Sequence, residues 1–180
     1  DKSPAFVEAI DLSNDQISLA QQRWKHDSRI KFSVGDARDF RPSQSFDVVT
    51  GLWILNYAKT REDLENFFAT ISYALQPQGV FLGINDNPFS PEQSYLDYKP
   101  YGFAKKFESP RQEGSKVVWV ISEPVEMKIT NYWWSPQSYK DAAKKAGLEL
   151  EFQNPDCSIP DSATPGYWDF FLDVPPFIAI

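Results

Sequence analysis

The stretch FDVVTGLWILNYAKTREDLENFFATISYALQPQGVFLGI spans residues 46–84 and has the pattern of a strand, a helix and a second strand. Phe46 to Leu55 is an almost continuous apolar run, as is typical of a strand buried on both faces. Thr60 is a suitable N-cap for the helix that follows, and Val80 to Ile84 is again short, apolar and rich in β-forming residues. This order predicts a βαβ unit, in which a helix joins two parallel strands and covers their sheet.

The predicted helix carries a single apolar stripe that can lie on the sheet. Its members recur at helical spacing: Leu64, Phe67, Phe68, Ile71 and Leu75. Pro77 and Gly79 come next, and we expect them to end the helix before the second strand begins.

An earlier part of the chain repeats this strand–helix–strand pattern. Ala5 to Ile10 is a short apolar strand, and Ser13 with Gln16 three residues later has the pattern of a capping box. Ile30 to Val34 alternates apolar with polar residues, which predicts a half-buried strand. The expected buried face of the intervening helix consists of Ile17, Ala20 and Trp24. We therefore predict an α/β fold with a mostly parallel, Rossmann-like sheet.

Polar residues follow the predicted strands at the edge where parallel sheets bind ligands. Asp11 follows the first strand, Asp36 follows the second, and Tyr57 and Asp86 follow the two strands of the βαβ unit. A carboxylate at such an edge can accept two hydrogen bonds from the vicinal diol of a ribose. Alternatively, each aspartate caps a helix or closes a turn.

The second half of the chain is expected to add a lid and an antiparallel finish. Residues 87–116 contain four prolines and little periodicity, which predicts an irregular loop over the site. Val117 to Ile121 and Val125 to Trp134 are two expected strands of a hairpin that turns at residues 122–124.

Further along, Ser135 before Pro136 indicates a helix start, and Leu148 to Phe152 and Pro175 to Ile180 are predicted strands. We accordingly divide the chain into a core (1–86), an inserted lid and hairpin (87–134) and a segment that completes the core (135–180).

Composition narrows the possible partners. The formal net charge of −7 and the pI near 4.7 disfavour binding to nucleic acid. No apolar run approaches the ~18 residues of a membrane span, so we expect no membrane partner. With His26 as the only histidine and Cys157 as the only cysteine, we predict no metal site and no internal disulfide, which fits the cytoplasm. The aromatic content of 16% is high and predicts an aromatic-lined pocket.

Five motifs occur in an order that resembles class I S-adenosylmethionine-dependent methyltransferases. These are VEAIDLSNDQISLAQQ, VGDARDF, FDVVTGLWILNYA, LQPQGVFLGI and the closing GYWDFFLDVPPFIAI. The end of the chain is similar to that of small-molecule methyltransferases of the toxoflavin-synthesis type. The resemblance covers most of the chain apart from the irregular lid, and its strength lies in the order of the motifs.

The resemblance implies S-adenosyl-L-methionine as the cofactor and assigns residues to it. Asp11 stands in the place of the ribose-binding acid, Leu12 lies where an apolar residue meets adenine, and Asp36 and Ala37 correspond to the adenine motif. Leu52 and Trp53 follow in the loop after the fourth family strand. The family's first strand and glycine-rich loop have no counterpart before Ala5, and we expect them to belong to an earlier segment of the protein.

The implied activity is transfer of a methyl group to a small, aromatic or apolar acceptor. Tyr57 and Asp86 are the candidate catalytic residues, for an acceptor that has to lose a proton. The candidate acceptor pocket consists of Trp53, Tyr57, Tyr98, Tyr101, Phe103 and Trp133. A homodimer is compatible with this reading. Two alternatives stay open: a non-catalytic scaffold with a methyltransferase-like fold, and a nicotinamide-dependent reductase.

Overall fold

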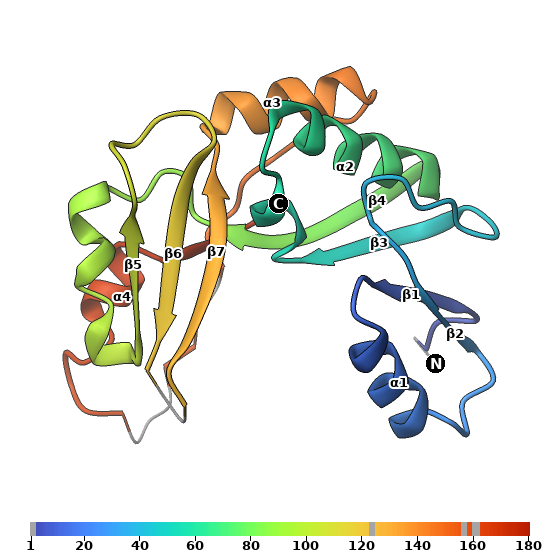
Figure 1. Cartoon of the computed structure of the whole chain (residues 1–180), viewed down its shortest axis with the longest axis horizontal. Helices are drawn as coiled ribbons and strands as arrows, with labels where there is room; N and C mark the ends of the chain where they lie inside the picture. Colours follow the sequence, from blue (N-terminus) through green and yellow to red (C-terminus); the bar gives the residue numbers. More distant parts are fainter. Residues whose placement is uncertain (1–2, 123–124, 156–157, 160–162) are drawn as a thin grey trace.

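The protein is described by a computed structural model that covers residues 3–122, 125–155, 158–159 and 163–180. Its strands form three sheets (Figure 1). In the first, β1 (Val7–Asp11) pairs in parallel with β2 (Ile30–Val34), and α1 (Asn14–Arg23) connects them. Ser13 caps α1 by accepting a hydrogen bond from the Gln16 N–H. Ile17 is buried as expected, whereas Trp24 is half exposed beyond the end of α1, so its expected burial was wrong.

The predicted βαβ unit is confirmed and forms the second sheet. Its elements are β3 (Phe46–Leu52), the 3₁₀ turn η1 (Ile54–Tyr57), α2 (Arg61–Ala74) and β4 (Leu75–Asp86). β3 and β4 pair in parallel, and the short β8 (Phe177–Ala179) adds antiparallel to the other edge of β4. The predicted finish with an antiparallel strand is thus present.

Two boundaries of this unit differ from the sequence prediction. β3 ends at Leu52 rather than Leu55, because Trp53 takes a left-handed backbone conformation (φ 63°) that turns the chain into η1. α2 ends at Ala74, and β4 begins at the next residue and continues through Pro77 and Gly79. Proline is tolerated there because the pairing of β3 with β4 is irregular between Leu75 and Val80.

The main core lies between this sheet and two helices, α2 and α3 (Pro136–Lys145), which lie side by side on one face of it (Figure 1). Both helices begin at the predicted caps, Thr60 and Ser135. The buried cluster consists of Leu55, Ala58, Leu64, Phe67, Phe68, Ile71, Trp134, Tyr139, Ala142 and Ala143. The apolar stripe of α2 supplies four of these side chains, as its spacing predicted.

The opposite face of β3 and β4 is uncovered in the part of the chain that the structure describes. Val48 and Leu52 on β3 are 50% and 66% exposed, and Val80 and Leu82 on β4 are 51% and 55% exposed. Val48 lies directly beside Val80, so these side chains share a continuous apolar strip. The prediction that this strand is buried on both faces was therefore wrong for the described residues.

The third sheet is antiparallel and contains β5 (Phe103–Phe107), β6 (Ser115–Ile121) and β7 (Met127–Trp133). β6 and β7 form the hairpin expected from the sequence, although Glu123 and Pro124 of its turn lie outside the described residues. Residues 87–116 are more regular than predicted, because they contain β5 and the 3₁₀ turns η2 (Glu92–Leu96) and η3 (Lys99–Tyr101).

The C-terminal segment differs most from its prediction. Leu148, Leu150 and Phe152 pack on the main core, yet their backbone forms no strand and pairs with β8 only at Gln153. The alternation of apolar residues in this segment reflects which side chains are buried, and it does not indicate strand pairing. The short helix α4 (Asp169–Asp173) was not predicted. Cys157 lies outside the described residues.

Replacing Phe68 by alanine should lower the free energy of unfolding by about 3–5 kcal/mol, because its fully buried ring would leave a cavity in the main core. Tyr73→Ala on the exposed side of α2 is the matched control. Its exposed ring packs against the Arg41 guanidinium at the surface, so the loss should stay below about 1 kcal/mol. Urea denaturation of both variants measures the difference, and equal losses would contradict this assignment of the core.

Candidate functional site

The carboxyl ends of the four parallel strands carry most of the predicted site residues. Asp11 ends β1, and its Oδ1 accepts a hydrogen bond from the Ser13 N–H at 2.7 Å, so this aspartate also supports the start of α1. Leu12 and Leu52 are strongly exposed at 67% and 66%. Asp86 ends β4. This edge therefore carries two exposed leucines, and an aspartate ends each of the strands β1 and β4.

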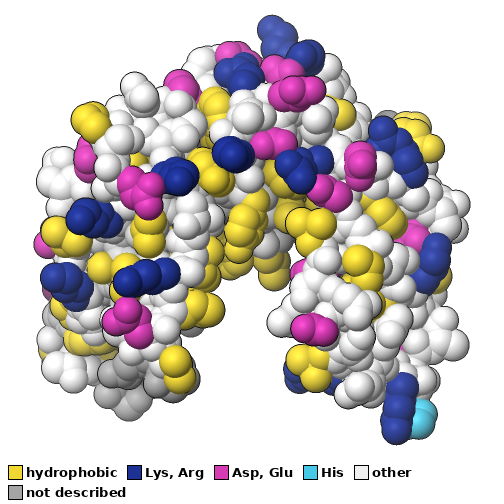
Figure 2. Space-filling view, viewed as in Figure 1, with side chains coloured by type: hydrophobic (Ala, Val, Ile, Leu, Met, Phe, Trp, Pro, Cys, Tyr) yellow, Lys and Arg dark blue, Asp and Glu magenta, His cyan; other side chains and the backbone are white. Residues whose placement is uncertain are grey.

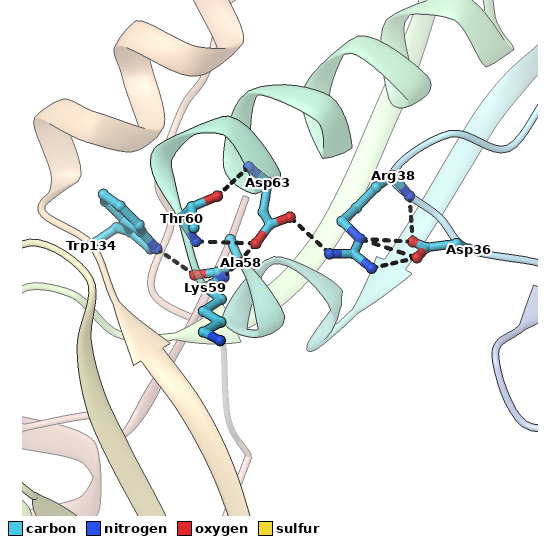
Figure 3. A network of polar contacts seen from close by, with 7 residues as sticks. All are labelled: Asp36, Arg38, Ala58, Lys59, Thr60, Asp63 and Trp134. Carbon is cyan, nitrogen blue, oxygen red and sulfur yellow. Dashed lines mark hydrogen bonds and ion pairs between the residues drawn. The ribbon is translucent and has the colours of Figure 1, made fainter.

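Asp36 follows β2 and is held by Arg38 (Figure 3). The Arg38 backbone N–H and Nε donate to Asp36 Oδ1 at 2.9 and 3.0 Å, and Arg38 Nη2 lies 2.5 Å from Oδ2. This bidentate arrangement fixes the plane of the carboxylate. Arg38 Nε also donates to Oδ2 at 3.1 Å, so Arg38 alone accounts for about four acceptor positions of this carboxylate.

Arg38 also joins this strand end to α2. Its Nη1 donates to Asp63 Oδ1 at 2.8 Å, while Asp63 Oδ2 accepts from the backbone N–H groups of Lys59 and Thr60. The Thr60 hydroxyl in turn accepts from the Asp63 N–H, which completes a capping box. Figure 3 shows the chain of contacts running from Asp36 to the N-terminus of α2.

The charges of this network perturb both acids in the same direction. Hydrogen bonds from Arg38 hold the pKa of Asp36 below its usual value. Burial alone would raise the pKa of Asp63, but hydrogen bonds from Arg38 and Thr60 outweigh burial, and that pKa is also lowered. Both aspartates are therefore ionised at neutral pH.

Asp86 forms a buried ion pair with Lys105 of β5. Lys105 Nζ lies 2.6 Å from Asp86 Oδ1 and 3.3 Å from the Pro176 carbonyl oxygen, and the lysine side chain is fully buried. Tyr95, Tyr98 and Trp119 surround the ammonium group, with ring centroids 4.1, 5.2 and 5.1 Å from Nζ. This cation–π cage compensates part of the cost of burying the charge.

Burial raises the pKa of Asp86 above its usual value, although Lys105 opposes this shift. Burial likewise lowers the pKa of Lys105, against the attraction of Asp86. Each group thus depends on the other to stay charged. Asp86 is therefore not a free carboxylate, and its predicted role as a general base has to operate within this pair.

Trp53 connects the parallel edge to the antiparallel sheet. Its indole ring packs edge-on against Trp119 and Phe177, with centroid distances of 5.9 and 5.7 Å. Its backbone N–H donates to the Ile84 carbonyl at 2.7 Å. A left-handed conformation is unfavourable for an aromatic residue, and such local strain is concentrated at functional positions.

The other predicted aromatic residues do not form one pocket. Tyr57 is half exposed at the end of η1, next to Asn56, whose Oδ1 accepts from the Asp86 N–H. Tyr98 is fully buried, with its hydroxyl bonded to the Val174 carbonyl, so in this structure it does not line an open pocket.

Tyr101, Phe103 and Trp133 lie on the antiparallel side. Tyr101 and Phe103 line a cavity at one end of the β5–β6 pair. Trp133 lies at the end of β7, with the Arg111 guanidinium 4.8 Å from its ring. The structure therefore places Trp53, Tyr57 and Asp86 at the parallel edge and the other four aromatic residues on the antiparallel side. The two groups meet at one buried cluster, on which Trp53, Phe103 and Trp133 all pack.

Two residues of the site were missed in the sequence, and each had a signal. Arg38 stands two residues after Asp36, where an aspartate side chain commonly bonds the backbone N–H. Lys105 alternates with Phe103 and Phe107 in FAKKF, so period-two patterning places the lysine on the apolar face of its strand. Within the described residues there is no cluster of metal-ligating side chains and no helix long and apolar enough to cross a membrane.

A deep hollow separates the β1–α1–β2 unit from the antiparallel sheet, and Figure 2 shows hydrophobic side chains along its roof, where β3 and β4 lie. In the described part of the chain, β1 pairs only with β2, and β3 pairs only with β4. β1 and β3 each therefore have one edge whose backbone N–H and C=O groups have no strand partner among the described residues.

Parallel βα units with an antiparallel last strand and acids at the carboxyl edge define an α/β, Rossmann-like fold. Among solved structures, the chain is similar to an S-adenosylmethionine-dependent methyltransferase from Clostridium acetobutylicum, with 14% identity, a TM-score of 0.61 and coverage of 97% of this chain and 73% of that one. It is also similar to S-adenosylmethionine-bound CalS10, an amino pentose methyltransferase from Micromonospora echinaspora (18% identity, TM-score 0.60, 97% and 72% coverage). The fold is that of the S-adenosylmethionine-dependent methyltransferases.

The sequence comparisons agree for the first part of the chain. Residues 1–79 match the sequence profile of a family described as "Methyltransferase domain". A stretch of 78 residues, 42% of the chain, is 36% identical to the putative methyltransferase YqeM of Bacillus subtilis. The match spans only 32% of the length of that curated relative.

Acidification should destabilise the wild-type protein more than it destabilises the Arg38→Gln variant. The lowered pKa values of Asp36 and Asp63 contribute stability above the ordinary aspartate pKa of about 3.9, and this contribution is lost as pH falls through the lower folded values. Urea denaturation between pH 6 and the onset of acid unfolding measures both slopes. Arg23→Gln, at an exposed arginine of α1, should behave as wild type. Identical slopes for wild type and Arg38→Gln would contradict the role of the network.

Lys105→Met should lower the free energy of unfolding by about 3–5 kcal/mol, because it leaves the Asp86 carboxylate buried without its partner. The double variant Lys105→Met/Asp86→Leu removes both charges and should be more stable than the single variant. Denaturation curves of Lys105→Met, Asp86→Leu and the double variant measure this coupling, and a double variant that loses as much as the sum of the two single variants would show that the pair is not coupled.

Proposed function

We propose that the protein is an S-adenosylmethionine-dependent methyltransferase that acts on a small, aromatic or apolar acceptor. The observation that carries the proposal is the carboxyl edge: Asp11 and an oriented Asp36 lie on one side, and Trp53 and Asp86 lie on the other. The agreement between this edge and the methyltransferase-like fold supports the assignment.

The residues present fit the cofactor by their chemistry. Asp11 is exposed, and its second carboxylate oxygen makes no hydrogen bond with another described residue, so it can accept from a ribose hydroxyl. The adenine amino group would share an Asp36 oxygen with Arg38, beside the backbone of Ala37 and the exposed Leu12. When bound, the cofactor supplies an electrophilic methyl group on a positively charged sulfonium. Aromatic faces such as that of Trp53 favour a cation of this kind.

The protein's own contribution would be mainly orientation. Methyl transfer needs the acceptor atom in line with the methyl group, and proximity with correct orientation can supply ~7–11 kcal/mol of a barrier. An acceptor that loses a proton would pass it to Asp86 or Tyr57, the two candidate catalytic residues nearest the end of β4. The hydrogen bond between Asn56 and Asp86 keeps these two segments in contact.

We further propose that the cofactor site is completed by a strand and a glycine-rich loop from outside residues 1–180. The unpaired edges of β1 and β3 and the apolar roof of the hollow support this extension. A strand between β1 and β3 would pair both edges and join the two parallel sheets into one. An unpaired buried backbone group costs roughly 1–3 kcal/mol of stability, and such a strand would remove this cost for every group that it pairs.

Asp11→Ala in the full-length protein should weaken binding of S-adenosylhomocysteine by about 1–3 kcal/mol, which is the cost of unpaired ribose hydroxyls. Isothermal titration calorimetry measures the dissociation constant. Asp15→Ala in the first turn of α1 removes a nearby acid outside the proposed site and serves as the control. An unchanged dissociation constant for Asp11→Ala would remove this residue from the site.

The proposed strand has its own test. Residues 1–180 alone should bind S-adenosylhomocysteine far more weakly than the full-length protein, because the glycine-rich loop would be missing. Equal binding by both would disprove the need for the extra strand. No binding by either would disprove the methyltransferase proposal and favour a scaffold role for the fold.

A further inference from the structure

The cavity that Tyr101 and Phe103 line lies away from the parallel edge, between η3, the β5–β6 pair and the segment around Tyr167. Its volume is about 480 Å³, within the range of small-molecule sites. Aromatic rings supply much of its wall: Tyr101, Phe103, Trp119 and Tyr167. Trp119 also contacts Trp53, so this indole lies between the cavity and the parallel edge. The cavity is therefore distinct from the proposed methyl-transfer site.

The aromatic walls are held by their own contacts. The Tyr101 hydroxyl donates to the Tyr167 carbonyl at 2.9 Å, and the Tyr167 hydroxyl donates to the Pro100 carbonyl at 2.6 Å. Phe103 stacks on Trp119 with centroids 5.1 Å apart, and Tyr101 stacks on Trp168 at 5.3 Å. Because both tyrosine hydroxyls already donate to carbonyls, these residues offer a ligand mainly their rings.

The charge that lines the cavity is positive. Lys99 is the charged residue among the described lining residues, and it forms no ion pair with another described residue. Ser122 adds a hydroxyl to the lining. No described carboxylate lines the cavity. A ligand that satisfies all these groups combines a flat ring with a negatively charged substituent.

We propose that this cavity is a binding site for a planar aromatic anion. The ring packs among Tyr101, Phe103, Trp119 and Tyr167, where aromatic pairs prefer edge-to-face or offset arrangements. The anionic substituent points to the Lys99 ammonium group at the rim. The site goes beyond the proposed methyl transfer, and binding to it requires neither the cofactor nor an acceptor.

The test uses the full-length protein and three probes in calorimetric titrations: 2-naphthoate, cyclohexanecarboxylate and 2-naphthylmethylamine. The first has both the ring and the charge, the second lacks the aromatic ring, and the third has the opposite charge. We expect 2-naphthoate to bind at least tenfold more tightly than either of the others. Equal affinity for 2-naphthoate and cyclohexanecarboxylate, or for 2-naphthoate and the amine, would overturn the proposed ligand class.

Two variants locate the binding. Lys99→Gln should weaken 2-naphthoate binding about fivefold, as expected for loss of one exposed charge contact, whereas Lys106→Gln on the exposed side of β5 should leave it unchanged. Ser122→Trp, which fills the cavity from its rim, should abolish binding. Thermal unfolding of each variant establishes that it is folded. Retained binding in Ser122→Trp, or wild-type affinity in Lys99→Gln, would place the ligand elsewhere and overturn the proposal.

Discussion

The carboxylate of Asp63 joins parts of the molecule that no strand pairing connects. One oxygen closes the N-terminus of α2 through the Lys59 and Thr60 N–H groups, and the other accepts from Arg38 beyond β2. β1 and β2 share no strand pairing with β3 and β4 in the described residues, so side-chain contacts hold the unit in place. The hydrogen bonds between Glu8 and Ser43 assist at the other end of β1.

The same region reaches the antiparallel sheet. Trp134, just after β7, donates its indole N–H to the Ala58 carbonyl at 2.8 Å, one turn before α2 (Figure 3). The start of α2 thus contacts segments from both sides of the hollow. Because helix α2 is anchored by its apolar stripe, its N-terminus is a fixed point from which Asp36 and the antiparallel sheet are positioned. A site built across separate sheets depends on such a common anchor.

The sequence was most informative where local chemistry and tertiary packing agree. The stripe from Leu64 to Ile71 and the cap at Thr60 defined α2, because both depend on residues close in the chain. The contacts of Asp86 could not be predicted in the same way, since its partner Lys105 comes from another sheet and pairing depends on how the sheets meet. Leu148 to Phe152 shows the opposite error, because alternation records which side chains are buried and not whether a neighbouring strand is within hydrogen-bond reach.

Burial of Lys105 also has a consequence for covalent chemistry. Amine-reactive reagents attack the neutral, accessible form of lysine, and the exposed lysines Lys31, Lys128 and Lys145 present their side chains to solvent. Lys105 has no solvent-accessible side-chain surface and is enclosed by three aromatic rings. Its labelling therefore requires the antiparallel sheet to separate from the end of β4. The rate at which the Lys105 amine is modified therefore measures how often that junction opens while the rest of the protein stays folded.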